Sequence, residues 1–211
     1  MSNRQLRITF SAAFFLIGLL VVCLIALFPG IEIVKAQKVN PNIVATLSNN
    51  TWAEASFPVE NFQAYTSPFG YRRSPTNPRS VQFHNGLDIA APKGSYIRNW
   101  FTGTVIQVGD RGACGTYIII ESGDWQHSYC HMQGNVAKID GHLYMIDRGG
   151  GIKIAQGQQI PSGIRIGRIG MTGRTTGPHL HWVLKYKGEY VDPGAILRQM
   201  YAGQDSGIPK S

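Results

Sequence analysis

Short β-favouring runs separated by glycine dominate this chain from about residue 64 onward. Five runs of five to seven residues cover 104–108, 116–121, 125–131, 164–169 and 181–186. They are rich in β-branched and aromatic residues, and Ser122-Gly-Asp124 between two of them is a hairpin turn signal. Helical periodicity is missing until residues 193–200, where the pattern favours a short helix. We therefore expect a mostly β, antiparallel fold.

The N-terminal segment predicts contact with a membrane. Arg4 and Arg7 precede an uncharged apolar run at residues 8–28, which as a helix spans a hydrocarbon core of ~30 Å. The positive-inside rule leaves residues 1–7 in the cytoplasm and puts everything after the run outside it, as a single-pass anchored protein. The alternative is a cleaved signal peptide, for which residues 34–36 supply a small-residue site, giving a secreted protein.

The rest of the chain divides into segments that differ in composition and periodicity. With 211 residues and 43% apolar composition, the chain has material for one folded domain. Residues 29–63 show no sustained period and indicate a linker or stalk, residues 64–198 form the predicted domain, and 199–211 form a tail. Residues 138–151 are an extra loop or hairpin that either shapes the groove or is a surface insertion, and His142 within it is expected to be exposed.

The net charge of +8 favours a polyanionic environment such as phospholipid headgroups or an anionic cell wall. The basic residues are scattered, without a basic helix or a clustered block, so nucleic acid is not an expected partner.

Two cysteines follow the membrane run, Cys114 and Cys130. Outside the cytoplasm disulfides persist, so this even pair is expected to be bonded. The competing interpretation makes Cys130 a nucleophile with neighbouring His131 as its base. The nucleophile interpretation is the weaker of the two, because the histidines and the aspartate of the motifs described next make up a complete metal site without a thiol.

Three short motifs carry metal-binding side chains: His84-Asn-Gly-Leu-Asp88, Tyr129-Cys-His131 and His179-Leu-His181. Strand alternation turns His179 and His181 to one face, and does the same for His84 and Asp88 if that segment is extended. Imidazoles and a carboxylate suit a zinc site that keeps an open position for water, with side chains left over for proton transfer. A zinc-dependent hydrolase is therefore indicated.

The motifs resemble the lysostaphin-type (LytM-like) zinc metalloendopeptidases, which hydrolyse peptide bonds in peptidoglycan. The resemblance covers about two thirds of the chain, through SPFGYR at 67–72, HNGLDIAAP at 84–92, GTV at 103–105, GMTGRTTGPHLH at 170–181 and VDP at 191–193. It implies that the antiparallel β-sheet forms an open sandwich with a groove, as in the lysostaphin/LytM type. It further implies that His84, Asp88 and His181 bind Zn²⁺. It also implies that His131 and His179 are the unliganded catalytic pair, which handle protons as water attacks the scissile bond.

Other residues have less defined roles in this pattern. His127 shares a predicted strand face with Tyr129 and His131, and a supporting or structural role is favoured for it over a catalytic one. Tyr71 and Arg72 are expected either to line the substrate groove or to pack. Two rival functions remain: a non-catalytic envelope scaffold that activates other cell-wall hydrolases, and a peptidoglycan-opening part of a secretion or conjugation machine. The complete set of ligands and histidines favours an enzyme.

Overall fold

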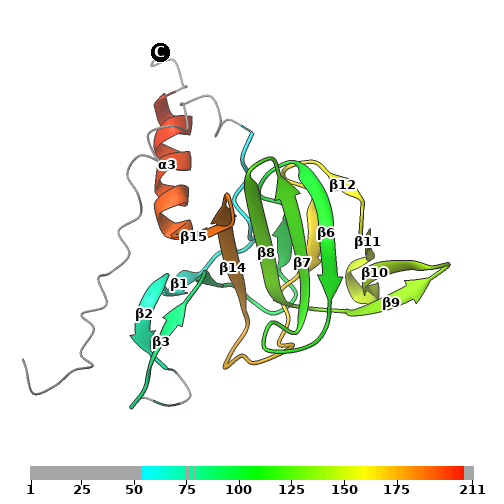
Figure 1. Cartoon of the computed structure of the whole chain (residues 1–211), viewed down its shortest axis with the longest axis horizontal. Coiled ribbons are helices and arrows are strands. Elements are labelled where there is room, and N and C mark those ends of the chain that lie inside the picture. Colours follow the sequence, from blue (N-terminus) through cyan, green and yellow to red (C-terminus); the bar gives the residue numbers. More distant parts are fainter. Residues whose placement is uncertain (1–53, 75–76, 78, 207–211) are drawn as a thin grey trace, which may run out of the picture. The chain divides into compact units, whose positions relative to one another are not determined.

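An antiparallel sheet forms the centre of the domain in the computed structural model, which describes residues 54–74, 77 and 79–206. Its strand order is β1-β4-β14-β8-β7-β6-β12, and β15 pairs with the far end of β14 (Figure 1). The strands are β1 (Ala64–Ser67), β4 (Leu87–Ala90), β6 (Gly103–Gly109), β7 (Thr116–Ser122), β8 (Trp125–Met132), β12 (Gln159–Ile160), β14 (His179–Tyr186) and β15 (Glu189–Val191). The predicted antiparallel, mostly β fold is confirmed.

Smaller elements surround this sheet. They are the hairpin β2 (Gly70–Arg73) and β3 (Val81–His84), the pair β5 (Tyr96–Arg98) and β13 (Arg165–Arg168), the three strands β9 (Asn135–Ile139), β10 (His142–Asp147) and β11 (Ile152–Ala155), the turn η1 (Arg148–Gly150) and the helix α3 (Pro193–Ser206). All five predicted β runs coincide with strands. In the predicted hairpin turn Ser122 pairs with Trp125, and Gly123 has the positive φ of 59° that glycine tolerates.

The core fills one side of the main sheet. Ile97 of β5 and Ile166 of β13 are fully buried there, and the rings of Trp100 and Trp182 meet edge to face at 5.6 Å. Helix α3 adds buried apolar side chains, including Met200, beside β14. The opposite side of the sheet is consequently free to form a groove.

The folded domain is wider than the predicted range 64–198. Ala55 and Val59 are buried in the core, and the Ser56 amide donates to the Trp100 carbonyl at 2.8 Å. The end of the predicted linker therefore belongs to the domain. The backbone of this segment is irregular and is held by separate hydrogen bonds to distant residues. Such a segment has no periodic pattern in its sequence. At the other end, α3 continues to Ser206.

The predicted membrane segment at residues 8–28 lies outside the described residues. Within the part of the chain that the structure describes, no helix has the length and apolarity needed to cross a bilayer.

The predicted insertion at 138–151 is a hairpin rather than a loop. Its turn, Asp140-Gly141, has positive φ at both residues, as a type I′ hairpin turn requires. Strands β9, β10 and β11 lie at the opposite end of the domain from β2 and β3 (Figure 1). An ion pair between Asp147 and Arg168, at 2.7 and 2.8 Å, fastens them to the body. His142 is exposed, as predicted.

His127 of β8 is a structural residue of the core. Its side chain is fully buried, with Nε2 2.9 Å from the Ser122 hydroxyl and Nδ1 2.8 Å from the Tyr129 hydroxyl. Burial lowers the pKa of His127 to about 3. The supporting role favoured from the sequence agrees with this position.

We expect His127 to make the domain sensitive to acid. Its folded pKa is depressed below the ordinary 6.5, so its stabilising effect is present above about pH 6.5 and is lost as the pH falls towards about 3. Between about pH 7 and pH 5.5 this amounts to about 1 kcal/mol of unfolding free energy. Urea titrations at both pH values should show a loss smaller by about that amount in His127→Gln than in the wild type.

The matched control is His142→Gln on the exposed β10, which should keep the wild-type pH dependence. Equal losses in the wild type and His127→Gln would contradict the assignment.

Candidate metal centre

Three candidate ligand atoms converge where β3, β4 and β14 meet. β4 and β14 pair with His181 opposite Asp88, so the two side chains lie next to each other on the groove face. His84 ends β3 and reaches the same point. Asp88 Oδ1 lies 3.0 Å from His84 Nε2 and 2.8 Å from His181 Nδ1, and these two nitrogens are 3.0 Å apart. This group can hold a metal ion.

Gly86 in the link between β3 and β4 permits this convergence. A β-carbon at this position would lie 2.5 Å from the carbonyl oxygen of Trp182 and 2.8 Å from His181 Cε1. Only glycine lets the chain pass so close to β14, which accounts for the glycine within the His84–Asp88 motif.

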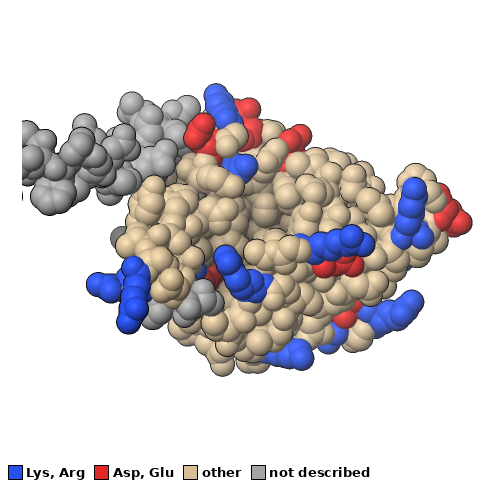
Figure 2. Space-filling model, turned by 60° about the horizontal axis from the view of Figure 1, so that its bottom comes forward, with Lys and Arg blue, Asp and Glu red and all other residues tan. Residues whose placement is uncertain are grey.

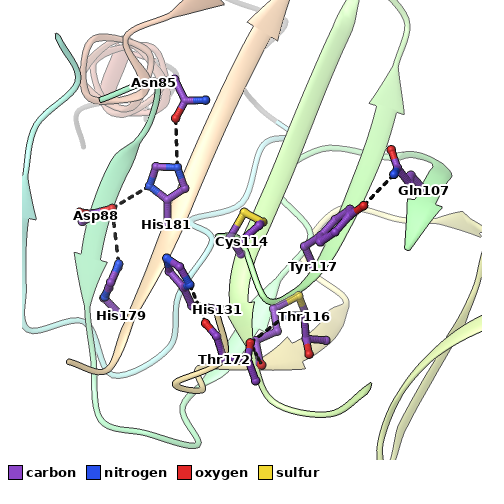
Figure 3. Close-up of a disulfide and its surroundings, with 12 residues drawn as sticks. Asn85, Asp88, Gln107, Cys114, Thr116, Tyr117, His131, Thr172, His179 and His181 are labelled. Carbon is purple, nitrogen blue, oxygen red and sulfur yellow. Dashed lines mark hydrogen bonds and ion pairs between the residues drawn. A yellow bond between two sulfur atoms is a disulfide. The ribbon is translucent and has the colours of Figure 1, made fainter. Parts of the chain in front are cut away.

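The outer nitrogen of each candidate ligand histidine faces an oxygen acceptor. His84 Nδ1 lies 2.7 Å from the carbonyl of Pro68. His181 Nε2 lies 3.2 Å from Asn85 Oδ1, a contact shown in Figure 3. Carbonyl oxygens only accept, so these outer nitrogens carry the protons. The nitrogens that face Asp88 are then left unprotonated, as metal ligation requires.

The other two predicted histidines lie beside this cluster and are held in the same way. His131 Nδ1 donates to the carbonyl of Thr172 at 2.8 Å, and His179 Nδ1 donates to the carbonyl of Gly177 at 2.9 Å. Their ring centroids are 4.8 Å apart, and His179 Nε2 is 3.6 Å from Asp88 Oδ1. In each ring Nδ1 is engaged by a backbone carbonyl, and Nε2 is the nitrogen that this hydrogen bond leaves free.

The expectation that His127, Tyr129 and His131 share one strand face is confirmed for His127 and Tyr129 and is wrong for His131. Along β8 the groove is lined by Gln126, Ser128 and Cys130, whereas His127 and Tyr129 point into the core. His131 reaches the groove because its φ is +61°, a left-handed conformation that interrupts the alternation. Its amide donates to the Cys114 carbonyl at 2.8 Å, which holds this conformation.

The predicted disulfide is present. Cys114 and Cys130 are bonded, and both lie along the groove (Figure 3). The bond fastens residues 110–115 to β8 beside His131, and it leaves Cys130 without a free thiol. The nucleophile interpretation of Cys130 therefore does not fit this structure.

The environment shifts the pKa values of several site residues. Burial alone would raise the pKa of Asp88, but the adjacent imidazoles of His181 and His84 outweigh burial and hold that pKa well below the usual range. Burial is the main cause that lowers the pKa of His131 to about 4, and it also lowers the pKa of His181. Asp88 is therefore ionised and these two imidazoles are neutral near pH 7.

The groove around the cluster has a volume of about 720 Å³. Arg72 lines it, with Nη2 3.8 Å from Asp88 Oδ2, whereas the side chain of Tyr71 is 57% exposed and does not line it. No residue of the 138–151 hairpin lines the groove. Sequence reasoning did not identify Asn85 as a partner of His181, although its position between His84 and Asp88 could have suggested that role.

A two-imidazole, one-carboxylate cluster with two further histidines beside it, on an antiparallel sheet, defines a metallopeptidase-type site. The sequence profile of Peptidase family M23 matches residues 82–193, more than half of the chain. The chain belongs to this family, and the predicted resemblance is confirmed.

Curated relatives are similar over part of their length. The DD-carboxypeptidase/endopeptidase Mpg of Neisseria meningitidis serogroup B is 34% identical over 131 residues, which cover 62% of this chain and 26% of that protein. The peptidoglycan DD-endopeptidase ShyA of Vibrio cholerae is 31% identical over 64% of this chain and 28% of its own length. The chain thus spans about a quarter of the length of these relatives.

Solved structures share the fold. A zinc-containing peptidase from Vibrio cholerae matches with 29% identity and a TM-score of 0.50, over 64% of this chain and 37% of that one. The catalytic domain of the prophage-encoded M23 protein EnpA from Enterococcus faecalis matches with 26% identity and a TM-score of 0.51, over 67% of this chain and 96% of that one.

We expect Asn85→Ala to weaken binding of a divalent transition metal by roughly tenfold to a hundredfold, because the outer nitrogen of His181 loses its acceptor. Competition with a chromophoric chelator measures this affinity. The control is Asn135→Ala on the exposed end of β9, which should bind metal like the wild type. Equal affinity in Asn85→Ala and the wild type would show that Asn85 does not orient His181.

Proposed function

We propose that this chain is a zinc-dependent endopeptidase that hydrolyses peptide bonds of peptidoglycan. The observation that carries the proposal is the approach of His84 Nε2, Asp88 Oδ1 and His181 Nδ1 to within 3.0 Å of one another, beside the imidazoles of His131 and His179. Membership of Peptidase family M23 and relatives named as DD-endopeptidases support it.

The donor set fits zinc. Two imidazole nitrogens and one carboxylate oxygen are a known ligand set for catalytic zinc, which leaves a position for water. The outer protons of both ligand histidines are already placed, so binding requires no change of tautomer. Bound zinc supplies Lewis acidity for the scissile carbonyl and lowers the pKa of water towards about 7.

His131 and His179 are proposed to move the protons of the reaction. With each Nδ1 proton held by a carbonyl, each Nε2 can accept a proton from the attacking water or, once protonated, donate to the developing oxyanion or the leaving amine. Two such groups provide both the base and the acid that peptide hydrolysis needs.

We further propose that the chain is anchored in the cell membrane by residues 8–28, with the domain outside the cytoplasm and in reach of peptidoglycan. The apolar run preceded by two arginines supports this location, and so does the Cys114–Cys130 disulfide, which persists in oxidising compartments.

The activity can be tested with the full-length chain in detergent micelles and purified peptidoglycan. We expect release of muropeptides that stops on chelation and in His181→Ala, whereas His131→Gln should lose roughly a hundredfold to ten-thousandfold in rate. His142→Ala, on the hairpin away from the groove, is the control. If the wild type binds zinc, leaves peptidoglycan intact and stimulates a separate amidase, the scaffold function replaces the enzyme.

The anchor is tested separately by sequencing the N-terminus of the mature protein and by membrane fractionation. We expect an intact N-terminal segment in the membrane fraction, because its apolar run exceeds the ~7–15 residues of a signal-peptide core. A mature protein that begins at Gln37 would instead indicate a cleaved signal.

A further inference from the structure

Two arginines on the rim of the groove lack an acidic partner. Among the described residues, the side chains of Arg111 and Arg174 form neither an ion pair nor a hydrogen bond, and both are exposed. Elsewhere in the domain several arginines are paired with carboxylates: Arg98, Arg165, Arg168 and Arg198. Arg111 and Arg174 therefore remain available to a ligand in the groove.

The two loops that carry these arginines are fixed to each other. The Arg174 amide donates to the Ala113 carbonyl at 2.8 Å, and the disulfide holds residues 110–115 to β8. Gly115 and Gly173 pack so closely that a β-carbon on either would collide with the backbone of the other loop. Because the two loops are fixed to each other, less backbone entropy is lost when a ligand binds to the arginines.

The two joined loops contact both proposed proton-transfer histidines. The Cys114 carbonyl accepts from the amide of His131 at 2.8 Å. Thr175, which follows Arg174, places its hydroxyl 3.3 Å from His179 Nδ1. A ligand group held by the arginines would therefore lie at the end of the groove next to the reacting bond.

The charge of the groove favours an anionic ligand. Its basic lining side chains are Arg72, Arg111, Arg174 and Lys185, and its acidic one is Asp88, whose Oδ1 is already engaged by histidines. Lys and Arg side chains are spread over the face of the domain shown in Figure 2. Guanidinium groups bind carboxylates through paired N–H donors, so a carboxylate is the anion that a peptide substrate would supply.

We propose that Arg111 and Arg174 form a carboxylate subsite, and that the substrate is a peptide with a free carboxylate close to the scissile bond. This inference rests on the proposed function and narrows its substrate class to acidic peptides. The carboxylate comes from one of two sources, the C-terminus of the peptide or an acidic side chain, and the chemistry of recognition is the same for both.

The test uses the full-length chain in detergent micelles and a dye-labelled peptide that has one D-alanyl bond followed by an acidic residue. The peptide is prepared in three forms: with both carboxylates free, with the C-terminus amidated, and with the acidic side chain amidated. Cleavage rates give kcat/KM for each form with the wild type and with the double variant Arg111→Gln/Arg174→Gln. Arg148→Gln, exposed in η1 and outside the groove, is the matched control.

We expect the wild type to lose roughly fivefold to tenfold in kcat/KM, mainly through KM, when the recognised carboxylate is amidated. The amidated peptide that shows the lower kcat/KM identifies which carboxylate, the C-terminal one or the side-chain one, is recognised. In the double variant the ratio between free and amidated peptides should approach one, and Arg148→Gln should keep the wild-type ratio. If amidation has no effect on the wild type, or the ratio is the same in the double variant, the subsite is wrong although the peptidase function stands.

A wild type that cleaves none of the peptides would contradict the proposed function, and the subsite is then tested by fluorescence anisotropy with the same peptides. Tighter binding of the free acid, lost in the double variant, would support the subsite. Equal binding of all forms would overturn it.

Discussion

The pairing of β4 with β14 is the constraint on which the site depends. It places His181 opposite Asp88 and brings His179 to the same face, while the other edge of β14 pairs with β8, which carries His131. Side chains alternate along a strand, so a slip by one residue would turn His179 and His181 into the core. The register is held by buried residues such as Leu180 and Trp182, whose side chains occupy the opposite face of β14. Core packing and site geometry are therefore fixed by the same pairing.

A second level of organisation comes from the proton positions of the four histidines. Each imidazole gives one nitrogen to an oxygen acceptor, from Pro68, Asn85, Thr172 or Gly177, and turns the other towards the centre. Three of these acceptors are backbone carbonyls, which side-chain substitutions do not remove. These proton positions suit the proposed roles, cation binding at His84 and His181 and proton transfer at His131 and His179.

Much of this arrangement could be predicted from the sequence, because it follows local rules. Short β-favouring runs separated by glycine located five of the strands, and the spacing of His179 and His181 placed both on one face. The orientation of His131 could not be predicted, because strand alternation puts its side chain in the core with that of Tyr129. A left-handed φ, held by a hydrogen bond to the Cys114 carbonyl, turns the side chain into the groove instead. Likewise, the packing of residues 55–60 depends on long-range partners such as Trp100 and Tyr96 that no local pattern reveals. The acceptors of the histidine protons are mostly backbone carbonyls, which carry no sequence signal.

The central claim is that His84, Asp88 and His181 hold a zinc ion while His131 and His179 stay off it. X-ray absorption spectroscopy of the zinc-loaded, full-length chain tests this most directly. The account predicts two imidazole ligands with oxygen ligands at about 2.0–2.2 Å, and a spectrum that does not change in His131→Gln. Three or more imidazoles on the metal, or a lost imidazole in His131→Gln, would contradict it.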